Sequence, residues 1–199
     1  MSSPRWIAIA AALLLAPVLL APAGDERTEE AYERYAVAAD HRLASEAGAE
    51  VLAAGGNAAD AAAATMLALG VVSPASSGLG GGGFLLYYRA SDRSLHYYDF
   101  RERAPGAATA NLFARREGDD DATAENRSRL GGLAVGVPGE PAGIAKMIEE
   151  LGSGRVTRRQ IVDPALRHAR DGFDTTPIWE LLSRYVGEPL RRDATLGRW

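Results

Sequence analysis

The chain has 199 residues, of which 47% are hydrophobic, and this is enough apolar material for the core of one domain. Its formal net charge of -4 argues against nucleic acid as a partner, and Lys146 is the only lysine. There is no cysteine, so an exported form of this chain would depend on its core and not on disulfides.

The first 23 residues have the pattern of an export signal. Arg5 supplies a positive charge, an apolar run follows from Trp6 to Leu20, and Ala21-Pro22-Ala23 forms a small-residue cleavage site. We therefore predict a signal peptide over residues 1–23, followed by a single segment over residues 24–199.

This signal predicts that the mature protein is exported, to the periplasm or to the extracellular space. The apolar run is slightly short for a transmembrane helix and is interrupted by Pro17, so we expect no stable membrane insertion after cleavage. An uncleaved N-terminal anchor stays as the alternative.

Two helices are predicted next. Apolar residues recur at three- and four-residue spacing over 43–52, and Gly55-Gly56 follows as a helix C-cap would. Asn57 can cap a second helix from Ala58 to about Val72, which has almost no polar residue after Asp60. A helix that is apolar all round is expected inside the protein, between layers.

A glycine run follows that helix. Five of the six residues over Gly78–Gly83 lack a Cβ, which requires either positive φ angles or the close approach of another backbone or a ligand. The run formally fits G-x-G-x-x-G, but a dinucleotide site follows a strand and opens a helix, and here the order is reversed. We therefore predict no nucleotide site and no bound cofactor.

The rest of the chain alternates short strands and helices. Phe84–Arg89 and Leu95–Phe100 are rich in aromatic and branched residues and predict an antiparallel hairpin. A polar loop is expected over 117–129, and a second glycine-punctuated strand over 131–139. Prolines in first-turn positions predict three helices, which run to about Leu151, from Pro164 to Asp171, and from Pro177 to Val186.

Few residues offer chemistry. The three histidines, at positions 41, 96 and 168, lack metal-ligand spacing, so we predict no metal site. No G-x-S-x-G motif exists. Ser76 and Ser77 precede the glycine run, and we interpret their hydroxyls as groups that hold a turn, because no histidine or lysine stands at a predictable spacing.

Arg101 is the charged residue that stands out. It follows the second predicted strand, at a strand end, where binding sites are commonly built. Its planar guanidinium binds a carboxylate with two parallel hydrogen bonds, which lysine does not. From the residues alone, the competing interpretation is an ion pair with Asp99 or Glu102, and that interpretation is favoured.

At these residues the sequence resembles the γ-glutamyltranspeptidases, also called γ-glutamyltransferases. The resemblance runs from about Ala36 to about Asp174 and consists of ordered motifs with family-like spacing. These motifs are Leu43-Ala44-Ser45 leading to Gly55-Gly56-Asn57-Ala58-Ala59-Asp60-Ala61, Ser76-Ser77-Gly78-Leu79-Gly80-Gly81-Gly82-Gly83-Phe84, Asp99-Phe100-Arg101-Glu102 with Ala104-Pro105, Gly136-Val137-Pro138-Gly139, and Ala169-Arg170-Asp171-Gly172-Phe173.

The resemblance implies an α+β fold, the four-layer αββα sandwich of the N-terminal nucleophile hydrolases, with only its N-terminal portion present here. It also implies a zymogen, in which a self-cleaving precursor frees an N-terminal threonine on a small subunit. That threonine attacks the γ-amide of glutathione or a related compound, and the glutamyl group passes to water, an amino acid or a peptide.

In this scheme, the position that matches Arg101 binds the α-carboxylate of the glutamyl group. The resemblance therefore reverses the preference for an ion pair and makes Arg101 a substrate-binding residue. No catalytic residue is assigned in this chain, because the family's threonine belongs to a later region. Thr175-Thr176 directly follows Asp171-Gly172-Phe173 and is not that nucleophile.

We therefore expect this chain to be the N-terminal part of a large subunit and to be inactive by itself. Its expected partners are a small γ-glutamyl substrate and the remaining segments of the large and small subunits. Two alternatives stay open: an amide hydrolase of the same fold such as a cephalosporin acylase, and a non-catalytic binding or structural remnant.

Overall fold

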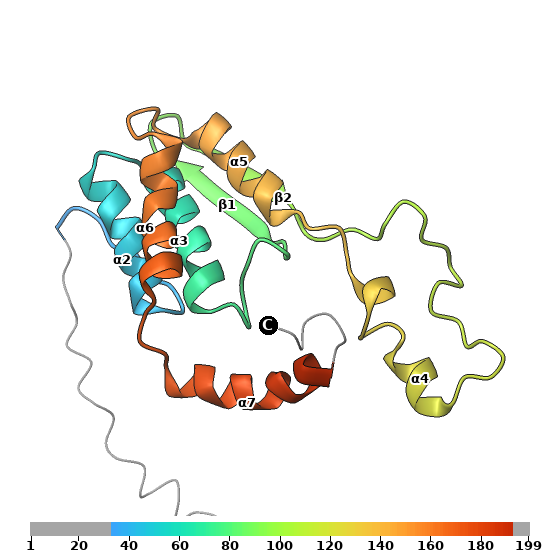
Figure 1. Ribbon diagram of the computed structural model, residues 1–199. Helices are drawn as coiled ribbons and strands as arrows, with labels where there is room; N and C mark the ends of the chain where they lie inside the picture. The colour runs from blue at the N-terminus through green and yellow to red at the C-terminus, as the bar shows by residue number, and fades with distance from the viewer. Residues whose placement is uncertain (1–32, 193–199) are drawn as a thin grey trace, which may run out of the picture. The chain divides into compact units, whose positions relative to one another are not determined.

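The computed structural model describes residues 33–192, and all of the described helices and strands lie in the compact unit Tyr35–Trp199 (Figure 1). In chain order these elements are α2 (Arg42–Ala53), α3 (Ala58–Val72), β1 (Phe84–Arg89), β2 (Ser94–Asp99), α4 (Asp121–Asn126), a 3-10 turn η1 (Gly132–Ala134), α5 (Glu140–Leu151), α6 (Arg158–Asp171) and α7 (Pro177–Arg192). The export signal predicted over residues 1–23 lies outside the described residues.

The first two predicted helices are confirmed, together with their end signals. The ring Nδ1 of His41 accepts a hydrogen bond from the Leu43 backbone N–H and caps α2. Gly55 has φ 97°, which is the left-handed conformation expected of a helix-ending glycine. Asn57 and Asp60 form a capping box at the start of α3, because each side chain accepts a backbone N–H of the other residue.

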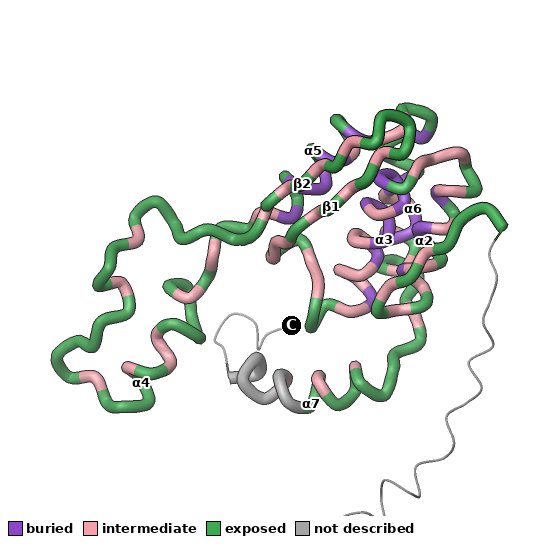
Figure 2. Tube along the Cα trace, turned by 180° about the vertical axis from the view of Figure 1, so that it is seen from behind, coloured by how far each residue is buried: buried purple, intermediate pink, exposed green. Residues whose placement is uncertain are grey.

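Helix α3 lies inside the unit, as its apolar sequence predicts. It packs against α2, α5 and α6, and the buried residues in Figure 2 gather on these four helices. The small residues permit a close approach, since a Cβ added to Gly48 of α2 would stand 2.3 Å from Oγ1 of Thr65. The main buried cluster draws on α2, α3, α5, α6 and the loop between α5 and α6: Val51, Ala59, Ala63, Ala64, Ile144, Met147, Leu151, Val156 and Ile161.

The capping box also joins distant parts of the chain. The Asp60 carboxylate is buried and accepts the Ser153 backbone N–H at 3.0 Å as well as that of Asn57. The Asn57 amide donates to the Leu151 carbonyl at 2.7 Å. These bonds attach the first turn of α3 to the loop between α5 and α6, and they satisfy a carboxylate that burial would otherwise destabilise.

The predicted hairpin is confirmed. β1 and β2 pair antiparallel, from Phe84 opposite Asp99 to Arg89 opposite Ser94, and they form a two-stranded sheet. Burial alternates along both strands. Leu85, Tyr87 and Tyr98 pack against the main buried cluster, so one face of the hairpin covers the helices.

Two predicted segments are wrong in detail. The strand expected over 131–139 is the turn η1 followed by one isolated bridge between Val137 and Arg103. Pro138 has no N–H to extend that bridge, and no second strand pairs with the segment among residues 33–192. Within the polar loop expected over 117–129 lies the short helix α4, whose first turn is capped by the Asp120 side chain.

The last helices begin or end at different residues than predicted. α6 starts at Arg158 and not at Pro164. Thr157 and Gln160 form a capping box there, which starts the helix before the proline. Pro164 lies inside this helix and is buried. α7 extends to Arg192 rather than ending at Val186.

The described residues thus combine helices with one small sheet, which agrees with the predicted α+β class. Of the four layers of an αββα sandwich, they supply a helical layer and one hairpin on it. No helix within residues 33–192 is long and apolar enough to cross a bilayer.

Candidate functional site

Three segments converge where the hairpin meets the start of α5. The Gly81 carbonyl accepts the backbone N–H groups of Gly139 and Glu140, both at 3.0 Å. The Phe100 N–H donates to the Gly83 carbonyl at 3.0 Å, and the bridge between Arg103 and Val137 follows. The glycine run, the segment after β2 and the start of α5 therefore form one hydrogen-bonded junction.

Close backbone approach explains most of the glycines in this junction. A Cβ on Gly82 would stand 2.5 Å from the Phe100 carbonyl oxygen, and one on Gly139 would stand 1.9 Å from the same oxygen. A Cβ on Gly143 would stand 2.4 Å from the Phe100 ring. Within the run, a left-handed backbone is needed only at Gly78, where φ is 154°. Of the two explanations that the sequence permits, close approach is the main one.

A polar hollow of about 350 Å³ lies beside the glycine run, and we call it the serine–glycine hollow. Its lining is Pro74, Ser76, Ser77, Gly78, Gly80, Gly81, Gly82, Glu102 and Glu140. The two carboxylates come from different elements, since Glu102 follows β2 and Glu140 opens α5. No arginine, lysine or histidine is among these lining residues.

Glu140 is the unusual member of this set. Its side chain is buried, with the residue 4% exposed, and its Oε1 has no hydrogen-bond partner among the described residues. Burial raises the pKa of the Glu140 carboxyl, the Gly78 backbone N–H opposes that shift, and the charge of Glu102 adds to it. The sequence does not mark this residue, because an acid in the first turn of a helix is usually an exposed partner of the helix dipole.

Arg101 borders a second hollow of about 290 Å³, which we call the arginine hollow. Tyr98, Phe100, Val137 and Lys146 are among its lining residues. The Arg101 backbone N–H donates to Asp99 Oδ1 at 3.0 Å, but its exposed guanidinium makes no ion pair with any described acid, Asp99 and Glu102 included. The described residues therefore do not support the competing interpretation, in which Arg101 forms an ion pair with Asp99 or Glu102.

The structure gives the other candidate residues structural contacts. The Ser76 hydroxyl bonds Ser73 Oγ at 2.9 Å in the turn after α3, as a turn-holding role requires. His96 bonds the Ser94 hydroxyl at 2.8 Å, and His168 lies in the last turn of α6. Among residues 33–192, no three His, Cys, Asp or Glu side chains are grouped so as to hold a metal ion.

Comparison with known proteins decides the family. Residues 44–195 match the family described as γ-glutamyltranspeptidase. The chain belongs to this family. A glutathione hydrolase proenzyme of Pseudomonas sp. (strain A14) is 43% identical over 148 residues, covering 72% of this chain and 24% of that protein.

Solved structures agree with this assignment and with the expected fold. The γ-glutamyltranspeptidase of Helicobacter pylori superposes with a TM-score of 0.77 at 34% identity, covering 85% of this chain and 47% of that one. A cephalosporin acylase from Bacillus halodurans superposes with a TM-score of 0.62 at 28% identity, covering 83% of this chain and 32% of that one. The chain spans between 21% and 29% of the length of the curated relatives that it matches.

Proposed function

We propose that the protein containing this chain is a γ-glutamyl acyltransferase and hydrolase, which moves the γ-glutamyl group of glutathione or a related compound to water, an amino acid or a peptide. The observation that carries the proposal is the family match over residues 44–195, and relatives named glutathione hydrolase support it. The substrate is a small γ-glutamyl compound, and the segments that complete the site are the remaining parts of the large and small subunits.

Arg101 has the substrate-binding role in this proposal. Its guanidinium is exposed beside the arginine hollow and is not engaged by any described acid. A guanidinium in that state is available to bind the α-carboxylate of a glutamyl group with two parallel hydrogen bonds. The nucleophile is the threonine that self-cleavage frees in relatives of this kind, and no residue over 33–192 is assigned to that role.

The test is made on the product of the complete open reading frame that encodes this chain. Arg101→Ala and Arg101→Lys are expected to lower kcat/KM for γ-glutamyl-p-nitroanilide while leaving the fold and self-cleavage intact. Loss of one partner of such a charge pair costs about 2–5 kcal/mol, or roughly 30- to several-thousand-fold in affinity. A lysine variant with near-normal kcat/KM would rule out the two-bond clamp.

The lone chain gives a second test of the same proposal. Expressed alone, residues 24–199 are expected to release no p-nitroaniline from this substrate, because no described residue pairs a nucleophile with a positioned base. Clear turnover by this segment would overturn the mechanism.

A second candidate function is favoured by the structural likeness to a cephalosporin acylase. Both activities open an amide bond in the same fold, and they differ in the acyl group. The complete protein is assayed with γ-glutamyl-p-nitroanilide and with glutaryl-p-nitroanilide, which has the same chain length and terminal carboxylate but lacks the α-amino group. Preference for the glutaryl amide would favour the acylase, because the α-amino group that defines a γ-glutamyl substrate would then not be required.

Export is part of the proposal. We propose that residues 1–23 are a signal peptide that is removed on export, because Arg5, the apolar run and the Ala21-Pro22-Ala23 site occur in order. N-terminal sequencing of the protein from the periplasm or culture medium is expected to find a chain that begins at Gly24. A mature chain that still begins at Met1 would indicate an anchor.

A further inference from the structure

We propose that the serine–glycine hollow is a binding site for a primary ammonium group, with the carboxylates of Glu102 and Glu140 as its anionic ligands. Three oxygen atoms face the same small volume in front of Gly81. Measured from the point where a Cβ on Gly81 would stand, the Gly78 carbonyl oxygen is at 3.2 Å, Glu102 Oε1 at 3.5 Å and Glu140 Oε2 at 3.8 Å. The missing side chain at Gly81 leaves these oxygens uncovered on the side of the hollow.

The unpaired oxygen of Glu140 is the independent sign of a ligand. Oε1 of Glu140 is buried and accepts no hydrogen bond within residues 33–192, although the side chain lines the hollow. A buried acceptor without a donor costs about 1–3 kcal/mol, and more when it is charged. Oε2 of the same carboxylate is the oxygen near Gly81, and a cationic donor bonded to Oε2 would offset the cost of the buried charge. Glu140 is held in place because its backbone N–H is bonded to the Gly81 carbonyl.

The charge around the hollow selects a cation. Glu102 and Glu140 both contribute negative charge, and the lining contains no basic side chain to neutralise them. Arg101 borders the arginine hollow and not this one. The N–H groups of Gly139 and Glu140 at the start of α5, which would favour an anion, donate to the Gly81 carbonyl. The charge of the lining therefore favours a cation over an anion.

The donor set fits an ammonium group better than a metal ion. A primary ammonium group has three N–H donors, so a complete site offers it three hydrogen-bond acceptors around the nitrogen. The two carboxylates and the Gly78 carbonyl oxygen supply that number. A Ca²⁺ ion takes six to eight oxygen ligands, and the described acids form no group of three. The volume of about 350 Å³ is sufficient for a ligand of amino-acid size.

Amino acids and peptides carry such a group. The assignment of this ammonium group to the acceptor of γ-glutamyl transfer rests on the proposed function. The binding site itself does not depend on that function.

The test measures binding without any γ-glutamyl donor. Glycinamide, the small primary ammonium used as the probe, is titrated into the product of the complete open reading frame and followed by ligand-observed NMR. N-acetylglycinamide, in which the amine is acylated and uncharged, is the matched control ligand. We expect saturable binding of glycinamide only, and a loss of affinity of about 30-fold or more in Glu140→Gln and in Glu102→Gln.

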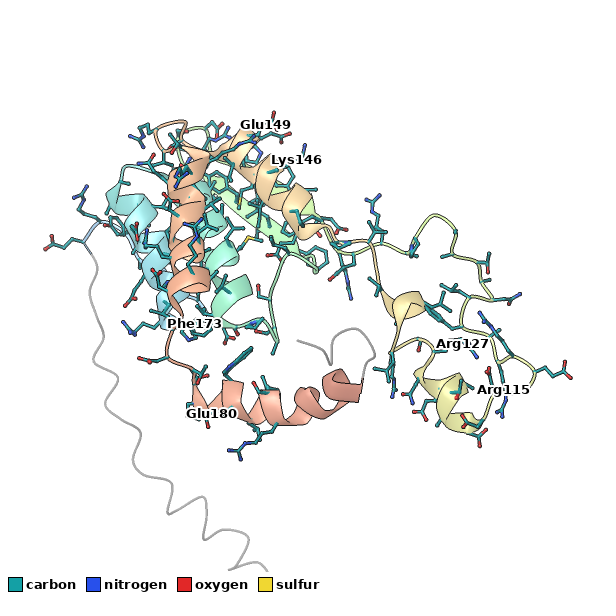
Figure 3. All side chains as sticks on the ribbon, in the orientation of Figure 1. Arg115, Arg127, Lys146, Glu149, Phe173 and Glu180 are labelled. Atoms are coloured by element: carbon teal, nitrogen blue, oxygen red, sulfur yellow. The ribbon has the colours of Figure 1, made fainter. Side chains whose placement is uncertain are left out.

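Two control variants separate this site from its surroundings. Glu149→Gln removes a carboxylate that is exposed on the same helix α5 (Figure 3) and is expected to leave glycinamide binding unchanged. Arg101→Ala disables the clamp of the proposed function and is also expected to leave glycinamide binding unchanged. A failure of this site is thereby distinguished from a failure of the proposed activity.

The wild-type protein supplies a test that does not depend on the folding of a variant. Because the raised pKa of Glu140 means that this carboxyl takes up a proton as pH falls, glycinamide binding is expected to weaken toward acid pH. Equal binding of glycinamide and N-acetylglycinamide, no saturable binding at neutral pH, or equal affinity in the Glu140→Gln and Glu149→Gln proteins would each overturn the proposal.

Discussion

The two faces of the β1–β2 hairpin have similar side chains and opposite surroundings. On the inner face, Leu85, Tyr87 and Tyr98 pack against the main buried cluster of the helices. The outer face is at least as apolar, but its side chains are left exposed. Its large side chains are between 55% and 68% exposed: Phe84, Leu86, Tyr88, Leu95 and Tyr97.

This difference shows what kind of sheet the hairpin belongs to. A sheet with one face in water alternates apolar and polar residues, whereas a sheet that is covered on both faces is apolar throughout. β1 is apolar from Phe84 to Tyr88, which is the second pattern, whereas β2 has Ser94 and His96 on its inner face and its exposed Leu95 and Tyr97 on the outer face. Phe84 and Tyr97 stack on the outer face, with ring centroids 6.2 Å apart. The hairpin is therefore built to be covered on its outer face, which agrees with the two stacked sheets of the family fold.

The prediction with the largest expected effect places charges on each face of the hairpin in turn. Leu86 and Tyr97 are register partners on the outer face, and Leu85 and Tyr98 are the adjacent partners on the inner face. In residues 24–199 expressed alone, Leu86→Lys with Tyr97→Glu is expected to raise the soluble fraction, because it removes exposed apolar area. Leu85→Lys with Tyr98→Glu is expected to cost about 3 kcal/mol or more, because two side chains leave the core contact.

The readouts are the soluble fraction after expression and the light scattering of the purified protein. In the complete protein, the outer pair is expected to become destabilising as well, since its face is then covered. The comparison fails if both pairs have the same effect on the lone segment, or if the outer pair leaves the complete protein unchanged.

Most of the helical layer was predictable from the sequence, because each end has a local chemical signal. Asn57 and Gly55 mark the ends of neighbouring helices by side-chain and backbone geometry alone. The start of α6 was also marked, by the capping box of Thr157 and Gln160, but Pro164 suggested a later start. A strand is different, because pairing depends on a partner elsewhere in the chain, and the segment over 131–139 has only one bridge.

The candidate site was predictable in part. Arg101 was found through its position after a strand and through the family motif, and both are features of the sequence. Glu140 was not found, because its importance comes from burial and from the nearness of Glu102, which lies 38 residues earlier in the chain. The glycines were recognised as unusual, but only the structure shows that Gly82 and Gly139 both make room for the Phe100 carbonyl.

A smaller effect is expected where the inner face of the hairpin joins α5. Gly139→Ala would place a Cβ 1.9 Å from the Phe100 carbonyl oxygen, which is a backbone atom and does not move without shifting the end of β2. Such overpacking costs about 1–3 kcal/mol. Gly106→Ala is the matched control, because nothing lies within 4 Å of its added Cβ. We expect a lower melting temperature for Gly139→Ala only, and equal melting temperatures would contradict the role of close approach.

The smallest effect concerns the turn that joins the two strands, where both faces of the hairpin end. Asp92 accepts hydrogen bonds from the Ser94 hydroxyl at 2.6 Å and from the Ser94 backbone N–H at 3.0 Å. These bonds, with a smaller contribution from Arg89, lower the pKa of Asp92 from 3.8 to about 2. Because the folded pKa is below the unfolded value, the stabilisation is fully present above pH 3.8 and is lost as pH falls through about 2.

Ser94→Ala removes the hydroxyl that contributes most to this shift. An NMR titration of the Asp92 carboxyl carbon is expected to give a midpoint near 2 in the wild-type protein and a midpoint closer to 3.8 in the variant. The difference in melting temperature between the two proteins is expected to be small at neutral pH, because the turn is exposed, and to shrink further as the pH is lowered. A wild-type midpoint near 3.8, or no change in the variant, would show that the turn bonds do not hold the end of the hairpin in solution.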